Sequence, residues 1–136
     1  MKKTAAIILV SILMASCSSV ILKTEGSRDL FYRDGKLIAS YVYNGSGEVL
    51  KDGVFIEGLV SEYYPDNKIK ARHIYRKGIK NGETQEFFES GVIKSTVFYE
   101  DGLLSGMAKY YFETGEIKEE GYYVKGKKDG EWKDYY

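Results

Sequence analysis

Residues 82–106 read GETQEFFESGVIKSTVFYEDGLLSG, and residues 106–130 read GMAKYYFETGEIKEEGYYVKGKKDG. The second stretch repeats the first at a step of 24 residues, with glycines, paired aromatic residues, an Ile-Lys pair and a tyrosine in matching positions. The same columns extend backwards to Gly58 and forwards to Tyr135 and Tyr136. A fixed period of this length indicates a repeat architecture, in which each unit buries its apolar face only against its neighbours.

Each unit divides into two segments of strand length. In the central unit these are residues 83–88 and 93–99, with turn signals at Ser90-Gly91 and Asp101-Gly102. Such pairs place a residue that tolerates positive φ at the corner of a short hairpin, while aromatic and β-branched residues favour strands. The sequence therefore predicts an all-β fold, an elongated single antiparallel meander of repeated β-hairpins over residues 29–136.

Side chains that alternate along a strand point to opposite faces of the sheet. We expect one face to carry the column of Ile69, Ile93 and Ile117 with that of Tyr75, Tyr99 and Tyr123, and the other face to carry Lys70, Lys94 and Lys118 with Ile74, Phe98 and Tyr122. Two strands per unit place like residues about 10 Å apart, so that rings and cations form rows. We also expect little conventional core, with cross-strand pairs of roughly 0.2–1 kcal/mol each holding the sheet together.

The N-terminus has the composition of a secretory signal. Positive charge at Lys2 and Lys3 precedes an apolar run from Ala5 to Met14, which is too short for a helix that spans a bilayer with about 20 residues. The run ends in Leu-Met-Ala-Ser-Cys at residues 13–17, which resembles the bacterial lipobox, and Cys17 is the single cysteine of the chain. A plain cleaved signal or a short membrane anchor is the alternative.

The lipobox resemblance implies a lipoprotein. Residues 1–16 would be the signal peptide, Cys17 the site of lipid attachment, with palmitate among its acyl chains, and residues 17–28 a tether. Ser18 directly after the cysteine implies sorting to the outer membrane of the cell envelope. One acyl chain anchors only weakly, so stable attachment requires more than one.

Composition excludes several classes of function. The chain of 136 residues carries 20 basic and 20 acidic residues, and this balance argues against binding to nucleic acid. One cysteine permits neither an internal disulfide framework nor a multi-cysteine metal site. His73 is the single histidine, without a second histidine or a free thiol to support metal binding or nucleophile activation, so we interpret it as structural. We therefore expect no metal, no cofactor and no catalytic residues.

The repeat also resembles a known family. The core pattern Tyr-Tyr-x-x-Gly-x-Ile-Lys and the link Tyr-x-x-Gly-x-x-x-Gly are similar to the bacterial variant of the MORN repeat, over roughly residues 29–136. Relatives of this type are often labelled YwqK-family antitoxins. MORN arrays elsewhere act as scaffolds, dimerisation surfaces or binders of membrane lipid, and the resemblance implies a role of this kind.

A basic segment supplies the candidate ligand or partner surface. No acidic residue lies between Asp66 and Glu83, and alternation predicts four of the basic residues in this segment on one face. The candidate surface combines these four residues with exposed rings of later strands: Lys68, Lys70, Arg72, Arg76, Phe98, Tyr122 and Trp132. Each cation near an anionic surface contributes about 1 kcal/mol. The alternative is a solvated strand face balanced by acidic residues of later units.

These observations predict a membrane-anchored lipoprotein that acts as a non-enzymatic binding or scaffolding module. Its expected partners are the membrane, through the N-terminal lipid, and an envelope protein, a glycan or an anionic lipid. The charged edge strand at residues 131–136 allows homo-association. Two alternatives stay open: an antitoxin that neutralises a partner toxin, and an enzyme that acts on an envelope glycan.

Overall fold

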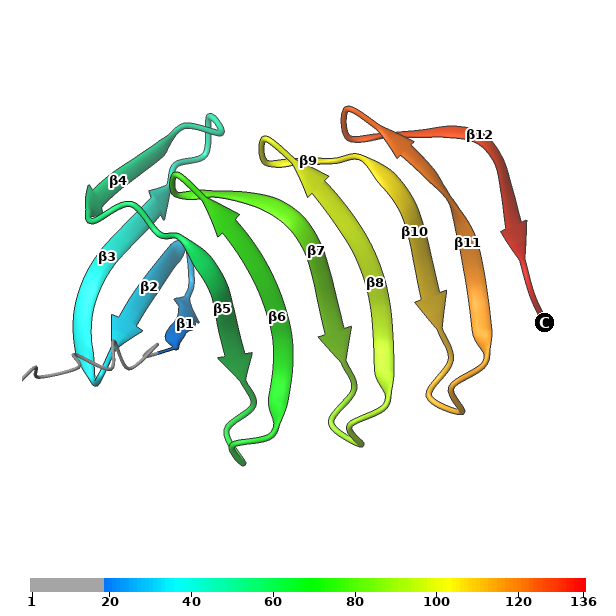
Figure 1. The fold of residues 1–136 in the computed structure, drawn as a ribbon, viewed down its shortest axis with the longest axis horizontal. Coiled ribbons are helices and arrows are strands. Elements are labelled where there is room, and N and C mark those ends of the chain that lie inside the picture. The colour runs from blue at the N-terminus through cyan, green and yellow to red at the C-terminus, as the bar shows by residue number, and fades with distance from the viewer. Residues whose placement is uncertain (1–18) are drawn as a thin grey trace, which may run out of the picture.

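The computed structural model describes residues 19–136, which form one sheet of twelve strands and no helix (Figure 1). In chain order the strands are β1 (Val20–Glu25), β2 (Arg28–Arg33), β3 (Lys36–Tyr43), β4 (Val49–Gly53), β5 (Gly58–Tyr63), β6 (Ile69–Arg76), β7 (Ile79–Phe87), β8 (Ile93–Glu100), β9 (Leu103–Leu104), β10 (Gly106–Tyr111), β11 (Ile117–Val124) and β12 (Lys127–Asp134). The prediction of an all-β meander of repeated hairpins is confirmed. Over the same residues, the structure contains no helix with the length and apolarity needed to cross a membrane.

The sheet consists of two meanders joined at their first strands. Strands lie in the order β12-β11-β10-β8-β7-β6-β5-β1-β2-β3-β4, and β9 pairs with β8. Neighbours pair antiparallel except for β1 and β5, which run parallel from Val20↔Val60 to Leu22↔Glu62. Figure 1 shows the consequence: β1–β4 gather at one end of the molecule, and the regular repeats from β5 to β12 extend away from them.

Part of the expected tether belongs to the sheet. Residues 20–25 form β1, which pairs with β2 on one side and with β5 on the other. Val20 and Leu22 are only 3% and 4% exposed, because their alternate positions turn both side chains into the core. The sheet therefore begins nine residues before the predicted boundary at residue 29. The predicted signal peptide, residues 1–16, and Cys17 lie outside the described residues.

The N-terminal end of the sheet also contains a conventional core, which the sequence did not lead us to expect. Phe31, Ile56 and Val60 are fully buried, and the Phe31 ring packs at centroid distances of 4.7 Å from Tyr41 and 5.5 Å from Tyr75. Ile56 lies in the connection from β4 to β5. Because this connection returns the chain to pair with β1, the sheet curls and encloses apolar side chains.

One contact closes the curl between strands that are far apart in the sheet order. The Lys51 ammonium of β4 donates a hydrogen bond of 2.9 Å to the carbonyl oxygen of Gly78, in the turn between β6 and β7. The same ammonium lies 4.9 Å from the centre of the Tyr41 ring. Cation–π contacts of this kind contribute roughly 0.5–1 kcal/mol at exposed sites and more when desolvated.

Two kinds of turn alternate along the array and keep its period. At one end of the strands, both turn residues have positive φ, as in type I′ turns: Lys77-Gly78, Asp101-Gly102 and Lys125-Gly126. The glycine N–H of these turns donates to the carbonyl oxygen of Ile56, Lys80 and Leu104, respectively. At the other end, Phe88 N–H bonds to Val92 and Gly91 N–H bonds to Phe88, a pattern repeated at residues 64–68 and 112–116.

Gly78→Ala tests the closure of the curl. A Cβ at Gly78 would lie 2.7 Å from the Tyr41 hydroxyl, whereas a Cβ at Gly35, in an equivalent turn, would have no atom within 4 Å. Their φ values of 73° and 75° are nearly equal, so each alanine costs roughly 1–2 kcal/mol of backbone strain. We expect Gly78→Ala to lose a further ~1–3 kcal/mol through overpacking.

Urea denaturation of both variants measures this difference directly. Equal losses of unfolding free energy in Gly78→Ala and Gly35→Ala would contradict this prediction. They would mean that the Tyr41 side chain moves away from the added Cβ at no cost, and that the curl is not tightly packed at this point.

Candidate functional site

The buried residues of the repeats lie in a row across one face of the sheet, which we name the inner face. Cross-strand register places Val60 opposite His73, His73 opposite Thr84, and Thr84 opposite Val97. All four side chains are at most 6% exposed. The opposite, outer face carries Phe98 and Tyr122, which are 38% and 51% exposed. The inner face is therefore the more buried of the two faces at these positions.

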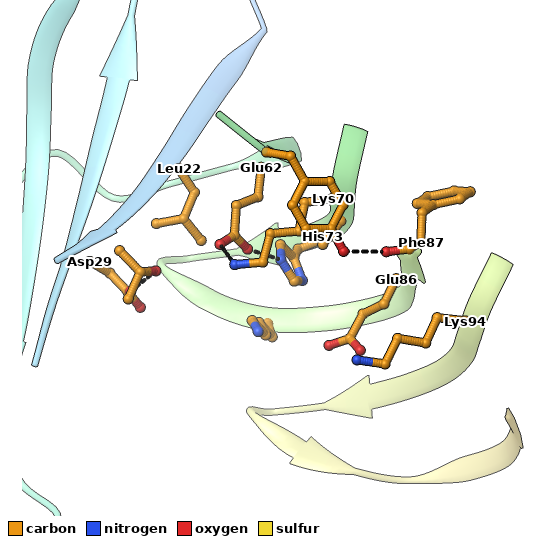
Figure 2. A pocket seen from close by; sticks show the side chains of 12 residues that line it. Leu22, Asp29, Glu62, Lys70, His73, Glu86, Phe87 and Lys94 are labelled. Atoms are coloured by element: carbon orange, nitrogen blue, oxygen red, sulfur yellow. Dashed lines mark hydrogen bonds and ion pairs between the residues drawn. The ribbon is translucent and has the colours of Figure 1, made fainter. Parts of the chain in front are cut away.

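A cavity of about 280 Å³ opens on the inner face where the curled end meets the repeats (Figure 2). Strands β1 and β2 form one wall, and strands β5–β8 form the other. The charged side chains that line it balance one another: Asp29, Glu62 and Glu86 against Lys70, Lys80 and Lys94. His73 also lines the cavity. This is the candidate functional site.

Glu62 is held as a carboxylate by two neighbours. Its Oε1 accepts a hydrogen bond of 2.7 Å from the Lys70 ammonium, and its Oε2 lies 3.6 Å from Nε2 of His73. Contact with His73 and with Lys70 lowers the pKa of Glu62 to about 2, against the opposing effect of burial. The other ring nitrogen of His73, Nδ1, lies 3.4 Å from the Thr84 hydroxyl. These contacts join β5, β6 and β7 below the cavity.

The lysines of the repeats lie on the inner face, contrary to the prediction from simple alternation. The register shifts between Glu62 and Tyr63, so that Lys70 has no direct partner in β5 and its side chain turns toward Glu62. A bulge of this kind redirects side chains next to it. Register shifts recur at Glu86/Phe87 and Tyr110/Tyr111, and there Lys94 lies 6.0 Å from the Phe88 ring centre and Lys118 lies 5.8 Å from that of Phe112.

The structure does not bring the predicted surface together. Lys68 lies in a turn and pairs with Asp66 at 3.1 Å, and Lys70 lines the inner cavity. Arg72 and Arg76 are exposed on the outer face with Phe98 and Tyr122, because their neighbours in the strand point inward. Trp132 lies on the inner face, where its ring occupies the space that a Cβ at Gly121 would need. These seven residues therefore do not lie together on one face of the sheet.

Lys80 is a cation of the site that the sequence analysis did not single out. Its side chain lines this cavity and a second one of about 320 Å³ formed by tyrosines of β3, β6 and β8. The ammonium lies 5.4 Å from the centre of the Tyr99 ring, and burial lowers the pKa of Lys80. The repeat did carry a signal for this residue. The positions 24 residues before and after Lys80 are the apolar Ile56 and Leu104, so a lysine departs from the pattern of its column.

Asp29 was also missed, because it belongs to the irregular start of the array. Its two carboxylate oxygens accept hydrogen bonds from the hydroxyls of Thr24, at 2.7 Å, and Tyr43, at 2.8 Å. Burial, and then the bond to Asp29, raise the pKa of Tyr43. Within residues 19–136, no group of three His, Cys, Asp or Glu side chains is placed to hold a metal ion.

Acid titration tests the role of Glu62. Its pKa of about 2 lies below the ordinary value of 4.5, so its contribution to stability is complete above pH 5 and is lost as the pH falls toward 2. The difference corresponds to at most about 3 kcal/mol. We expect Glu62→Gln to lower the unfolding free energy at pH 7 and to flatten its decline between pH 5 and 2.5. Exposed Glu89→Gln is the control, and a Glu62→Gln profile that matches it would contradict this assignment.

Comparison with known proteins agrees with the period of the array. Residues 56–77, 80–101 and 104–125 match the family described as the MORN repeat variant. No curated protein matches the chain. Among solved structures, the crystal structure of TarM is 16% identical with a TM-score of 0.35, covering 82% of this chain and 21% of that chain.

Another solved structure, of accessory secretory protein 1, 2 and 3 in Streptococcus pneumoniae, is 16% identical with a TM-score of 0.25 and covers 76% of this chain and 17% of that chain. The chain therefore spans about a fifth of the length of either solved chain. The family match begins at the same position in each of three consecutive units, at the step of 24 residues seen in the sequence. This chain is a MORN-repeat protein.

Proposed function

We propose that the protein is a non-enzymatic binding or scaffolding module that engages its partner with the inner face of the repeat sheet. The observation that carries the proposal is the polar cavity on that face, between β1–β2 and β5–β8. Ligand sites in proteins are concave and hold a few convergent polar groups, and this cavity has that form. Beyond it, the half-buried Tyr99, Tyr123 and Trp132 extend the same face along the array.

The ionisation of Glu62 and the hydrogen bonds of Asp29 support a binding role over a catalytic one. A general acid at neutral pH requires a raised pKa, whereas Glu62 is held ionised by Lys70 and His73, with a pKa of about 2. Asp29 accepts one hydroxyl hydrogen bond at each of its oxygens, from Thr24 and from Tyr43. These carboxylates act as structural partners of neighbouring side chains.

We further propose that a lipid on Cys17 holds the module at the membrane of a bacterial cell envelope. The support is the apolar run and the lipobox-like residues 13–17. Because β1 begins at Val20, only two residues separate Cys17 from the sheet. The module would therefore lie close to the membrane surface, with much less reach than a tether of twelve residues would give.

Metabolic labelling with palmitate tests the anchor. Wild-type protein should incorporate label and fractionate with membranes, and Cys17→Ala should lose both properties. Ser18→Ala is the control that keeps the acceptor cysteine, and it should be labelled as well as wild type. Label that persists in Cys17→Ala would overturn the lipoprotein proposal.

Paired charge reversals test which face binds. Lys94→Glu with Lys118→Glu changes two inner-face cations, and Arg72→Glu with Arg76→Glu changes two outer-face cations. Each tagged full-length protein is incubated with detergent-solubilised envelope, and bound protein and glycan are quantified. The inner pair should reduce capture of the main partner at least about tenfold, since charged contacts at an interface contribute several kcal/mol in favourable cases. Equal capture by both double variants would contradict the use of the inner face.

A further inference from the structure

The cavity on the inner face has more hydrogen-bond donors than its own acceptors satisfy. Lys80 and Lys94 both line it, and neither ammonium has a hydrogen-bond or ion-pair partner within residues 19–136. Each instead lies near an aromatic ring, Tyr99 at 5.4 Å and Phe88 at 6.0 Å. A lysine ammonium carries three N–H donors and no acceptor. Two ammonium groups with six donors therefore face this space, and neither is hydrogen-bonded to an acceptor among the described residues.

The acceptors of the cavity are already engaged elsewhere. Glu62 binds Lys70 at 2.7 Å, and Asp29 accepts hydrogen bonds from Thr24 and Tyr43. Glu86 has a longer contact of 3.4 Å with the Ser95 hydroxyl. In Figure 2, Glu62, Lys70 and His73 gather on one side, while Glu86 and Lys94 lie together on the other. A ligand that supplies acceptor oxygens to Lys80 and Lys94 would complete this arrangement.

We propose that the cavity binds the carboxylate of a small hydroxyl-rich acid, a sugar acid of the size of a uronic acid, through the ammonium groups of Lys80 and Lys94. This inference rests on the proposed function, because it names the ligand class for the inner face. Hydrogen bonds between an ammonium and a carboxylate are short and about twice as strong as neutral ones. The partly desolvated surroundings of Lys80 strengthen such a bond further.

The mixed charge of the cavity favours a ligand with one negative charge over a ligand with two. Asp29, Glu62 and Glu86 all act electrostatically on Lys80, and each would also repel an incoming anion. Like charges within about 4–6 Å oppose one another's ionisation, so a phosphate dianion is less favourable here than a carboxylate monoanion. Recognition of a carboxylate therefore follows from the mixed charge, and not from a purely basic surface.

The size and polarity of the cavity select a small polar ligand. Its volume of about 280 Å³ lies at the lower end of small-molecule sites, which range over roughly 300–1,000 Å³. Leu22 and Ala71 supply little apolar lining, whereas Thr24, Glu86 and the Tyr64 ring offer contacts for hydroxyl groups and for the face of a sugar. The Tyr64 hydroxyl donates to the Phe87 carbonyl at 2.7 Å, which fixes the ring at the rim.

Isothermal titration calorimetry of the full chain in detergent tests the inference with three probes built on the same sugar ring: glucuronate, glucose 6-phosphate and glucose. We expect glucuronate to bind more tightly than glucose 6-phosphate, and glucose to give no measurable heat. Lys80→Met and Lys94→Met should each weaken glucuronate binding at least about tenfold, because each removes a charged hydrogen-bond donor. Met keeps the length of the buried chain, and circular dichroism verifies the sheet of each variant.

Lys118→Met is the matched control. Lys118 occupies the same repeat column as Lys94 and lies over Phe112 at 5.8 Å, but it does not line this cavity. Its substitution should leave glucuronate binding unchanged. Equal binding of glucose and glucuronate, tighter binding of glucose 6-phosphate, or an equal loss in Lys118→Met would each overturn the inference. The proposed function would survive these outcomes if the inner-face charge reversal still abolished capture of the envelope partner.

Discussion

The parallel pairing of β1 with β5 is the constraint on which the rest of the molecule depends. It lays Val20 beside Val60 and Leu22 beside Glu62, and it makes the chain return from β4 through the buried Ile56. An open meander leaves its inner face to solvent, whereas this return curls the first four strands toward the repeats. The curl supplies the apolar cluster that a single sheet otherwise lacks, and cross-strand contacts alone contribute only fractions of a kcal/mol each.

The cavity also results from the pairing of β1 with β5, because this pairing places the curled strands against the regular repeats. The repeats supply the floor, where Glu62, Lys70 and His73 connect neighbouring strands, and the bulges turn the lysines inward. The curled strands supply the opposite wall, with Leu22 from β1 and Asp29 from β2. Neither part forms the site alone. The last repeat keeps a lysine over an aromatic ring, Lys118 over Phe112, but β10–β12 contribute no residue to this cavity.

The local structure could be predicted from the sequence, but the residues that form the cavity could not. Particular residues show the physical reasons. Glycine positions and the 24-residue step predict hairpins because turn geometry is local, and Lys77-Gly78 adopts positive φ as such pairs do. Alternation failed at Lys70, because a one-residue bulge moves a side chain to the other face. The tether prediction failed at Val20 and Leu22, because pairing with β5 depends on residues about 40 positions away. Long-range pairing of this kind leaves no periodic trace, and so Asp29 and Lys80 could not be placed together from the sequence.

Hydrogen–deuterium exchange of the full chain, read by mass spectrometry, tests the central claim most directly. If β1 is a central strand held between β5 and β2, the amides of residues 20–25 exchange as slowly as those of residues 58–63. If residues 20–25 are a tether, their amides exchange at the rate of an unstructured peptide while the repeats stay protected. That second result would remove the curl, the core cluster and the enclosed cavity together.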